Sequence, residues 1–137
     1  MLAWILERWI DWSDNQGDIE KVFSKDDLLT HATIYWATGT IGSSVRTYAN
    51  NNRYPWTPSH DRQPRIEAPT GLTFVGYENP PGVSTAQRTA SWLATDRAAW
   101  YNHTNLTAHD HGGHFIPWEV PDLWVDDLRR TFRPTRG

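Results

Sequence analysis

The chain has 137 residues, about the size of one ordinary domain, and a formal net charge of −3 at pH 7 with acidic and basic residues mixed along it. That balance gives no electrostatic reason to expect nucleic acid or an anionic membrane as a partner. The absence of cysteine excludes disulfides and thiolate metal sites. A cysteine-free chain fits a reducing compartment, so we expect a cytoplasmic protein. Nine tryptophans suggest a large aromatic interior or an apolar substrate cavity.

The N-terminal segment has the pattern of a helix, with apolar residues at helical spacing: Leu2, Ile5, Leu6 and Trp9. Glu7 and Arg8 interrupt its apolar stretch, which is far shorter than the roughly 20 apolar residues of a spanning helix. It has no basic region before it and no small-residue cleavage site after it. We therefore expect neither a membrane span nor a signal peptide.

A second helical run begins after Ser24, which is followed three residues later by Asp27 in a capping-box-like start. Apolar residues then continue at roughly helical spacing: Leu28, Ala32, Tyr35, Trp36, Val45 and Tyr48. Gly39 and Gly42 interrupt this run, and we expect them to bend the helix or to admit another backbone. Residues 50–65 contain three prolines and many polar residues, which is typical of a surface connection.

Beyond this connection the pattern predicts strand, helix, strand, helix. Residues 71–77 and 103–109 are the strands, and residues 84–100 form the helix between them. The last helix begins at Pro121 and stops at Pro134. Two acids favour its positive dipole end, Glu119 and Asp122. Its apolar stripe consists of Val120, Leu123, Trp124, Leu128 and Phe132.

This order of elements implies a parallel strand pair joined by a right-handed crossover, and the fold class is α/β. Two parallel strands alone make a poor sheet, because a parallel sheet needs both faces covered and normally has several strands. We therefore expect the second half of the chain to be the end of a larger sheet.

Two loops follow the carboxyl ends of the predicted strands, where α/β sheets place their sites. One loop holds Glu78, and the other is "HDHGGHF", residues 109–115. A histidine beside an acid at this edge has the geometry of an oriented general base. Gly112 and Gly113 allow a sharp turn that aims one histidine inward. The residues alone leave open which histidine is the base.

A metal site is the alternative for this loop. Its ligands would be His109, Asp110, His111 and His114, a nitrogen and oxygen set that suits zinc or nickel. Adjacent loop residues rarely converge on a metal without distant ligands, and the sequence marks none. We therefore expect His109 and His111 either to be exposed or to contact the residues of the site without acting in it themselves.

Three segments carry a resemblance to a known family: "FSKDDLLTHATIYWATGTIGSSVRTYANN", "APTGLTFVGYE" and "DHGGHFIPWEVPDLWVDDLRRTFR". Together with the opening "LAWILERW", they resemble in order the C-terminal half of microsomal-type epoxide hydrolases, members of the α/β-hydrolase superfamily. The likeness covers nearly the whole chain. It implies the C-terminal portion of an α/β-hydrolase fold, two parallel strands with helices at residues 61–137, preceded by a helical cap-domain remnant at residues 1–60.

The resemblance also implies roles for individual residues. His114, in Gly-Gly-His-Phe, corresponds to the catalytic histidine, and Glu78 corresponds to its acid partner. Tyr48, in "SSVRTY", corresponds to a cap tyrosine that donates to the epoxide oxygen. In the family an Asp nucleophile opens the epoxide and forms an alkyl-enzyme ester, which the histidine hydrolyses to a vicinal diol. Trp36 is expected to line the substrate cavity, and no cofactor is implied.

The family's Asp nucleophile, its His-Gly-x-Pro loop and its first cap tyrosine have no counterpart in these residues. We therefore expect a truncated member that is inactive alone. The implied partners are a small apolar or aromatic epoxide and either a separately supplied N-terminal half or a second copy of the chain. The class alternative is a non-catalytic remnant or interaction module that exposes an apolar face.

Overall fold

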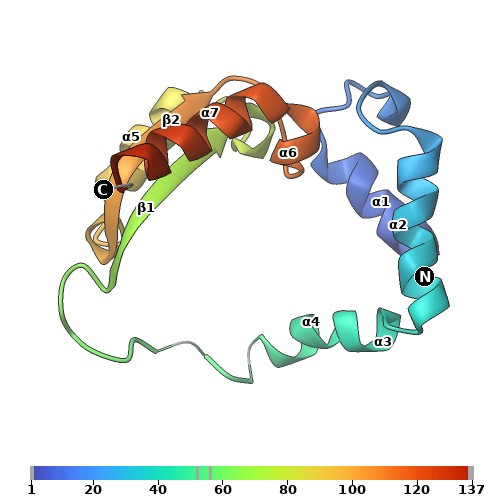
Figure 1. The fold of residues 1–137 in the computed structure, drawn as a ribbon, viewed down its shortest axis with the longest axis horizontal. Coiled ribbons are helices and arrows are strands. Elements are labelled where there is room, and N and C mark those ends of the chain that lie inside the picture. The colour runs from blue at the N-terminus through green and yellow to red at the C-terminus, as the bar shows by residue number, and fades with distance from the viewer. Residues whose placement is uncertain (1, 52, 56, 136–137) are drawn as a thin grey trace. The chain divides into compact units, whose positions relative to one another are not determined.

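The computed structural model describes residues 2–51, 53–55 and 57–135 (Figure 1). The chain forms two compact units, each with its own packing. The first unit comprises Met1–Asp11 and Asn15–Ser59, and the second comprises Trp12–Asp14 and His60–Gly137. The change of unit after Ser59 lies next to the predicted boundary between residues 60 and 61. Three residues of the N-terminal part nevertheless pack in the second unit.

The first unit is helical, as the sequence pattern predicts. Its elements are α1 (Leu2–Trp12), a 3-10 turn (Ile19–Lys21), α2 (Lys25–Thr38), α3 (Ile41–Ser44) and α4 (Arg46–Asn50). None of the helices in the described parts of the chain has both the length and the apolar character needed to cross a membrane.

The two ends of α2 differ in how well the sequence predicts them. Ser24 caps the start, where its hydroxyl accepts from the backbone N–H of Asp27 at 3.1 Å. Gly39 adopts a left-handed conformation (φ 65°) and ends the helix. The expectation of a bent helix at this glycine is therefore wrong, because the apolar residues that continue the run lie beyond the end of α2: Val45 lies between α3 and α4, and Tyr48 lies on α4.

The core of the first unit is small and aromatic. Phe23 is fully buried, and the ring of Trp9 meets it edge-on at 4.7 Å between centroids. His31 packs on the same Trp9 ring at 4.6 Å. Other large apolar side chains of this unit stay exposed: Trp4, Leu29, Ile34 and Trp36. The large aromatic interior suggested by the tryptophan count is thus not present among the described residues of this unit.

The second unit has the predicted order of strand, helix, strand and helix. The strands are β1 (Ile66–Val75) and β2 (Tyr101–His109), and they pair in parallel. The helices are α5 (Thr85–Leu93), α6 (Ile116–Glu119) and α7 (Pro121–Phe132), with short 3-10 turns at Gly76–Glu78, Ala98–Trp100 and Arg133–Thr135. The predicted parallel strand pair is confirmed.

β1 begins five residues earlier than its apolar pattern suggests, and its early part is irregular. The register shifts between Ile66 and Pro69 and again between Thr70 and Gly71. Proline has no N–H to donate to the ladder, which makes regular pairing there impossible. From Gly71 onward the pairing is regular and includes Thr73 opposite Thr107 and Val75 opposite His109.

Helix α7 packs against the two strands (Figure 1) through a face that is partly polar. Asp127 and Thr131 are buried there, whereas Phe132, assigned to the apolar stripe, is half exposed. Thr131 donates to the carbonyl of Asp127 at 2.8 Å, and a Cβ at Gly71 would overlap the Thr131 hydroxyl. Close approach of helix and strand therefore depends on a glycine in β1 and a hydrogen-bonded threonine in α7.

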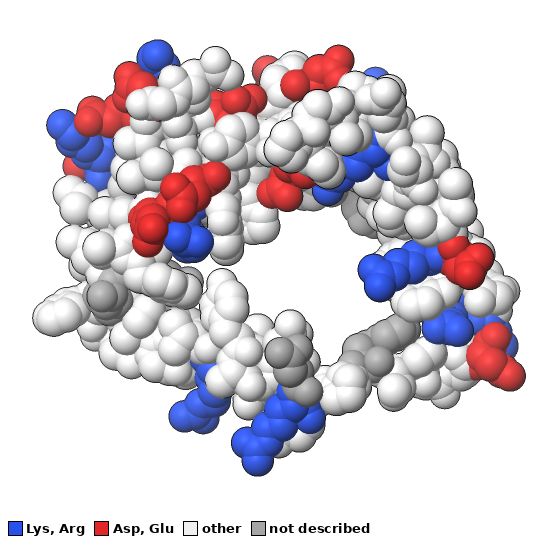
Figure 2. All heavy atoms as spheres, turned by 180° about the vertical axis from the view of Figure 1, so that it is seen from behind, with Lys and Arg blue, Asp and Glu red and all other residues white. Residues whose placement is uncertain are grey.

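Charged side chains form local pairs of opposite sign within each unit. Lys25 meets Glu20 at 3.3 Å in the first unit, and Arg129 meets Asp126 at 3.2 Å in the second. Figure 2 shows basic and acidic side chains interspersed on the face in view.

The close approach of the loops after β1 and β2 makes Gly76 sensitive to substitution. A Cβ there would overlap the backbone carbonyl of Asp110, which cannot rotate away. We expect Gly76→Ala to lower the free energy of unfolding by about 1–3 kcal/mol, as measured by urea denaturation. Gly42→Ala is the control, because nothing lies within 4 Å of a Cβ built there. Equal unfolding midpoints for the two variants would contradict the close approach.

Candidate active site

The loops that follow β1 and β2 continue the pairing of the strands. The last strand pair is Val75 opposite His109, and the next residue, Gly76, packs directly on the backbone of Asp110. The backbone N–H of Tyr77 then donates to the carbonyl of Gly112 at 3.0 Å. The turn carrying Glu78 is thereby tied to the Gly-Gly turn before His114.

Glu78 and His114 meet at the end of these paired loops. His114 Nδ1 lies 3.1 Å from Glu78 Oε1, and the two side chains are 53% and 37% exposed. The prediction that these two residues lie together is therefore met by the geometry. A carboxylate that accepts from Nδ1–H holds the imidazole in one tautomer and leaves Nε2 as the nitrogen that can take a proton. The exposure leaves this nitrogen within reach of water and substrate.

A buried threonine holds the Glu78 loop beside the end of β2. Thr85, in the first turn of α5, accepts from the side-chain amide of Asn79 at 2.8 Å and donates to the carbonyl of His109 at 3.2 Å. It is almost completely buried. The sequence pattern marks only the Ser/Thr start of this helix, so this bridging role was not predicted.

Both glycines of the predicted turn are required by their surroundings. Gly112 has φ +87°, a conformation that L side chains rarely adopt, and a Cβ there would press on Val120 at 3.1 Å. Gly113 is enclosed instead: its Cβ would lie 2.7 Å from the carbonyl oxygen of Trp12 and 2.9 Å from the backbone nitrogen of Asp14.

The segment Trp12–Asp14, here called the strap, binds the Gly-Gly-His turn directly. The backbone N–H of His114 donates to the carbonyl of Trp12 at 2.8 Å, and that of Gly112 donates to Asp14 Oδ2 at 3.0 Å. The Trp12 ring packs on the His114 imidazole with 4.9 Å between centroids. These contacts span about a hundred positions of sequence, and no local pattern predicted them.

Glu119 connects the strap to the turn from the other side. Its Oε2 accepts from the backbone N–H of Asp14 at 2.7 Å, and its Oε1 accepts from the backbone N–H of Phe115 at 2.8 Å. From the sequence, this acid is expected at the positive end of the last helix. In the structure it ends α6 and serves as a two-oxygen acceptor beside the candidate base.

Comparisons with known proteins give one class of relative. No family model matches the chain. It is 34% identical over 98% of its length to a putative epoxide hydrolase of Stigmatella aurantiaca. It is 28% identical over 95% to epoxide hydrolase 1 of Sus scrofa and 24% identical over 93% to the juvenile hormone epoxide hydrolase of Bombyx mori. The chain is homologous to epoxide hydrolases. It spans 27–28% of the length of these three relatives.

The two parallel strands and their helices are consistent with part of an α/β-hydrolase fold, as in epoxide hydrolases.

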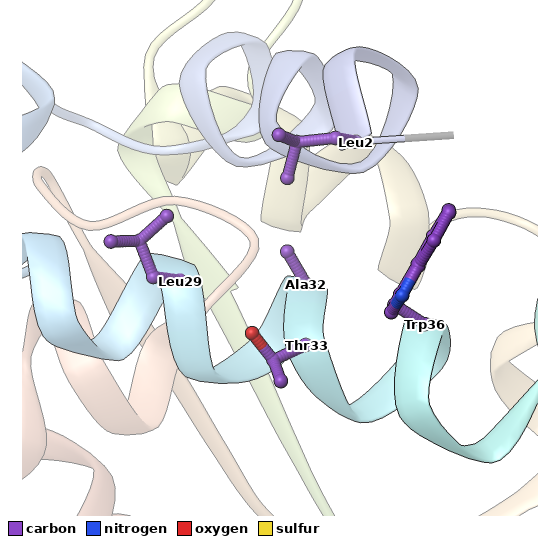
Figure 3. A pocket seen from close by; sticks show the side chains of 5 residues that line it. All are labelled: Leu2, Leu29, Ala32, Thr33 and Trp36. Carbon is purple, nitrogen blue, oxygen red and sulfur yellow. The ribbon is translucent and has the colours of Figure 1, made fainter.

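The two remaining residues predicted for the site lie in the first unit. Tyr48, on α4, is 61% exposed, and its ring meets that of Trp4 edge-on at 5.8 Å. Trp36 lines a pocket of about 360 Å³ between α1 and α2 (Figure 3), together with Leu2, Leu29, Ala32 and Thr33.

The pocket lies in the size range of small-molecule sites, and its lining is mostly apolar. In Figure 3 Trp36 and Ala32 project from α2 toward α1, which carries Leu2. The Trp36 side chain is 74% exposed.

The second unit contains another histidine–acid pair, which is more deeply buried than the first. His109 Nε2 lies 2.9 Å from Asp127 Oδ2, and the same oxygen accepts from the hydroxyls of Thr73 at 2.9 Å and Thr107 at 2.8 Å. Burial alone would raise the pKa of Asp127. Hydrogen bonds from His109, Thr107 and Thr73, with the charge of His109, outweigh burial and lower that pKa below its ordinary value.

The metal alternative can be compared with the same geometry. Among the residues that the structure describes, no group of three or more His, Asp or Glu side chains is arranged to hold a metal ion. His109 and His114 contact different carboxylates, Asp127 and Glu78. His111 is exposed.

Replacing Asp127 with Asn tests the buried pair. We expect the free energy of unfolding to fall by about 1–3 kcal/mol at pH 7, because an amide cannot accept all three hydrogen bonds as the carboxylate does. The folded pKa of Asp127 lies below its ordinary value of 3.8. The carboxylate therefore stabilises the fold above pH 3.8, and this contribution is lost as the pH falls through the folded pKa.

The difference between Asp127→Asn and the unmodified chain should accordingly shrink in acid, as measured by urea unfolding at stepwise lower pH. Asp126→Asn is the matched control on the same helix, because its exposed pair with Arg129 should contribute at most about 1 kcal/mol. A difference that stays constant with pH would show that the Asp127 charge does not stabilise the fold.

Proposed function

We propose that this chain provides the general base, its orienting acid and one oxygen donor of an epoxide hydrolase whose nucleophile lies outside these 137 residues. The single observation that supports this most is the 3.1 Å approach of His114 Nδ1 to Glu78 Oε1, in loops that follow neighbouring parallel strands. The homologous proteins named epoxide hydrolase support the reaction class.

In the proposed reaction an external Asp carboxylate attacks an epoxide carbon, the C–O bond opens, and an alkyl ester forms. Tyr48 donates a proton or hydrogen bond to the opening oxygen, which would otherwise become an alkoxide. His114 Nε2 then takes a proton from water as the water oxygen adds to the ester carbonyl. Glu78 stabilises the resulting imidazolium, which returns the proton to the departing alkoxide oxygen as the ester C–O bond breaks, so that the vicinal diol is released and the carboxylate is regenerated.

The substrate class that fits is a small apolar or aromatic epoxide. Support comes from the pocket beside Trp36, which offers an indole face and aliphatic side chains with one nearby hydroxyl, that of Thr33. Aromatic surfaces of this kind bind apolar groups by area burial and ring contact. The pocket and the His114–Glu78 pair lie in different units, and each is proposed separately as a part of the same reaction.

A chimera tests the base assignment. The segment of the Stigmatella aurantiaca relative that matches this chain would be replaced by the chain itself, so that the relative supplies the nucleophile. We expect the chimera to convert an aryl epoxide to its diol. His114→Ala should slow diol formation by roughly 10²–10⁴-fold and let the alkyl ester accumulate, as detected by mass spectrometry of the quenched enzyme.

His111→Ala is the matched control, because it removes an exposed histidine from the same loop and should leave turnover unchanged. Glu78→Gln should slow diol formation less than loss of the imidazole does. The 137-residue chain alone should hydrolyse the epoxide no faster than buffer. Equal turnover in His114→Ala and the unmodified chimera would exclude His114 as the base.

A partner segment or a second copy is proposed to cover the exposed apolar side chains of the first unit. Leu29 and Ile34 are each 53% exposed and Trp36 is 74% exposed, all on α2. We expect the chain to co-elute in gel filtration with the separately produced remainder of the Stigmatella aurantiaca relative. Two independent peaks, with the chain monomeric at all concentrations, would contradict both assembly with that segment and self-association.

A further inference from the structure

We propose that Asp14 and Glu119 are positioning residues for the general base, acting through the backbone of the turn that carries His114. This inference rests on the proposed role of His114. Each acid accepts a hydrogen bond from a backbone N–H within two residues of His114, Asp14 from Gly112 and Glu119 from Phe115. Asp14 belongs to the strap, Trp12–Asp14, and Glu119 binds the strap through the backbone N–H of Asp14.

Three backbone donors on and around the base are bound by acceptors of the strap and of Glu119. The N–H of Gly112 binds the Asp14 carboxylate, the N–H of His114 binds the Trp12 carbonyl, and the N–H of Phe115 binds the Glu119 carboxylate. Hydrogen bonds to carboxylates are roughly twice as strong as neutral ones. The backbone on both sides of the His114 Cα is therefore fixed by charged acceptors.

Glu119 uses both of its oxygens, one for the turn and one for the strap. The distances are 2.8 Å to the Phe115 nitrogen and 2.7 Å to the Asp14 nitrogen. Glutamine offers only one acceptor oxygen, and its NH₂ group would face an N–H donor. Asp14, by contrast, accepts from Gly112 with a single oxygen, which asparagine can reproduce.

The strap also restricts the ring of the base itself. The Trp12 indole lies 4.9 Å from the imidazole at an interplanar angle of 59°, and the Phe115 ring lies 5.4 Å away on an edge-on contact. With both rings in place, rotation of the imidazole away from Glu78 would remove aromatic contacts as well as the hydrogen bond. Sub-ångström placement of this kind is what general-base chemistry requires.

The test uses the 137-residue chain labelled at histidine for NMR. In the unmodified chain, the neutral imidazole of His114 should carry its proton on Nδ1, and its ring C–H signals should be shifted upfield by the Trp12 ring. Asp14→Ala and Glu119→Gln should lose the Nδ1–H preference and move these signals toward free-histidine positions. Asp14→Asn should retain both, and Asp122→Asn serves as an acid-to-amide control on α7.

The catalytic readout uses the chimera described above. Glu119→Gln should lower kcat by roughly 10- to 100-fold with KM unchanged, because a displaced base slows ester hydrolysis without altering substrate binding. Asp122→Asn, which changes an exposed acid on α7, should leave kcat within twofold of the unmodified chimera. A KM change with constant kcat would overturn the positioning role.

Amide hydrogen exchange in the unmodified chain tests the inference even if Asp14→Ala does not fold. Protection of the Gly112, His114 and Phe115 N–H groups is expected, and rapid exchange at all three would overturn the inference. Unchanged His114 tautomer and ring shifts in Glu119→Gln would overturn it as well. If those NMR effects appear but the unmodified chimera forms no diol, the positioning stands and the proposed function fails.

Discussion

The parallel register of β1 and β2 is the constraint on which the candidate site depends. Pairing of Val75 with His109 places the following loops side by side, and their contacts bring Glu78 within 3.1 Å of His114. A register slip of one residue would move one loop by about 3.3 Å along the other. That displacement exceeds the tolerance of a hydrogen bond, so the acid–base pair exists only in this register.

The buried carboxylate of α7 selects this register. Thr73 and Thr107 are opposite each other in the sheet, and both hydroxyls donate to Asp127 Oδ2. A slip would separate the two threonines and leave the carboxylate short of a donor in a buried position. Each hydrogen bond lost in this way would lower the free energy of unfolding by about 1–3 kcal/mol. A polar contact therefore sets the strand alignment that an apolar contact would specify only loosely, because apolar packing is non-directional.

Sequence reasoning succeeded where the signal is local. Strand and helix periods predicted β1, β2 and α7, and the rule that sites follow parallel strands brought Glu78 and the histidine loop together. The strap and Glu119 were missed because their contacts join residues 98 and 105 positions apart. Asp127 was missed for another reason: an acid in a helix reads as a solvated residue unless its hydroxyl and imidazole donors are known.

The two histidine–acid pairs show why residue type did not identify the base. His109 and His114 lie five residues apart, and each contacts a carboxylate at about hydrogen-bond distance. The first pair is 16% and 4% exposed, and its acid accepts two further hydroxyls. Transferring a proton there would disturb a satisfied buried network, whereas the second pair, 53% and 37% exposed, can exchange protons with water. Exposure therefore distinguishes the structural histidine from the candidate catalytic one. The burial of His109 follows from how α7 packs against the strands, which the "HDHGGHF" motif does not encode.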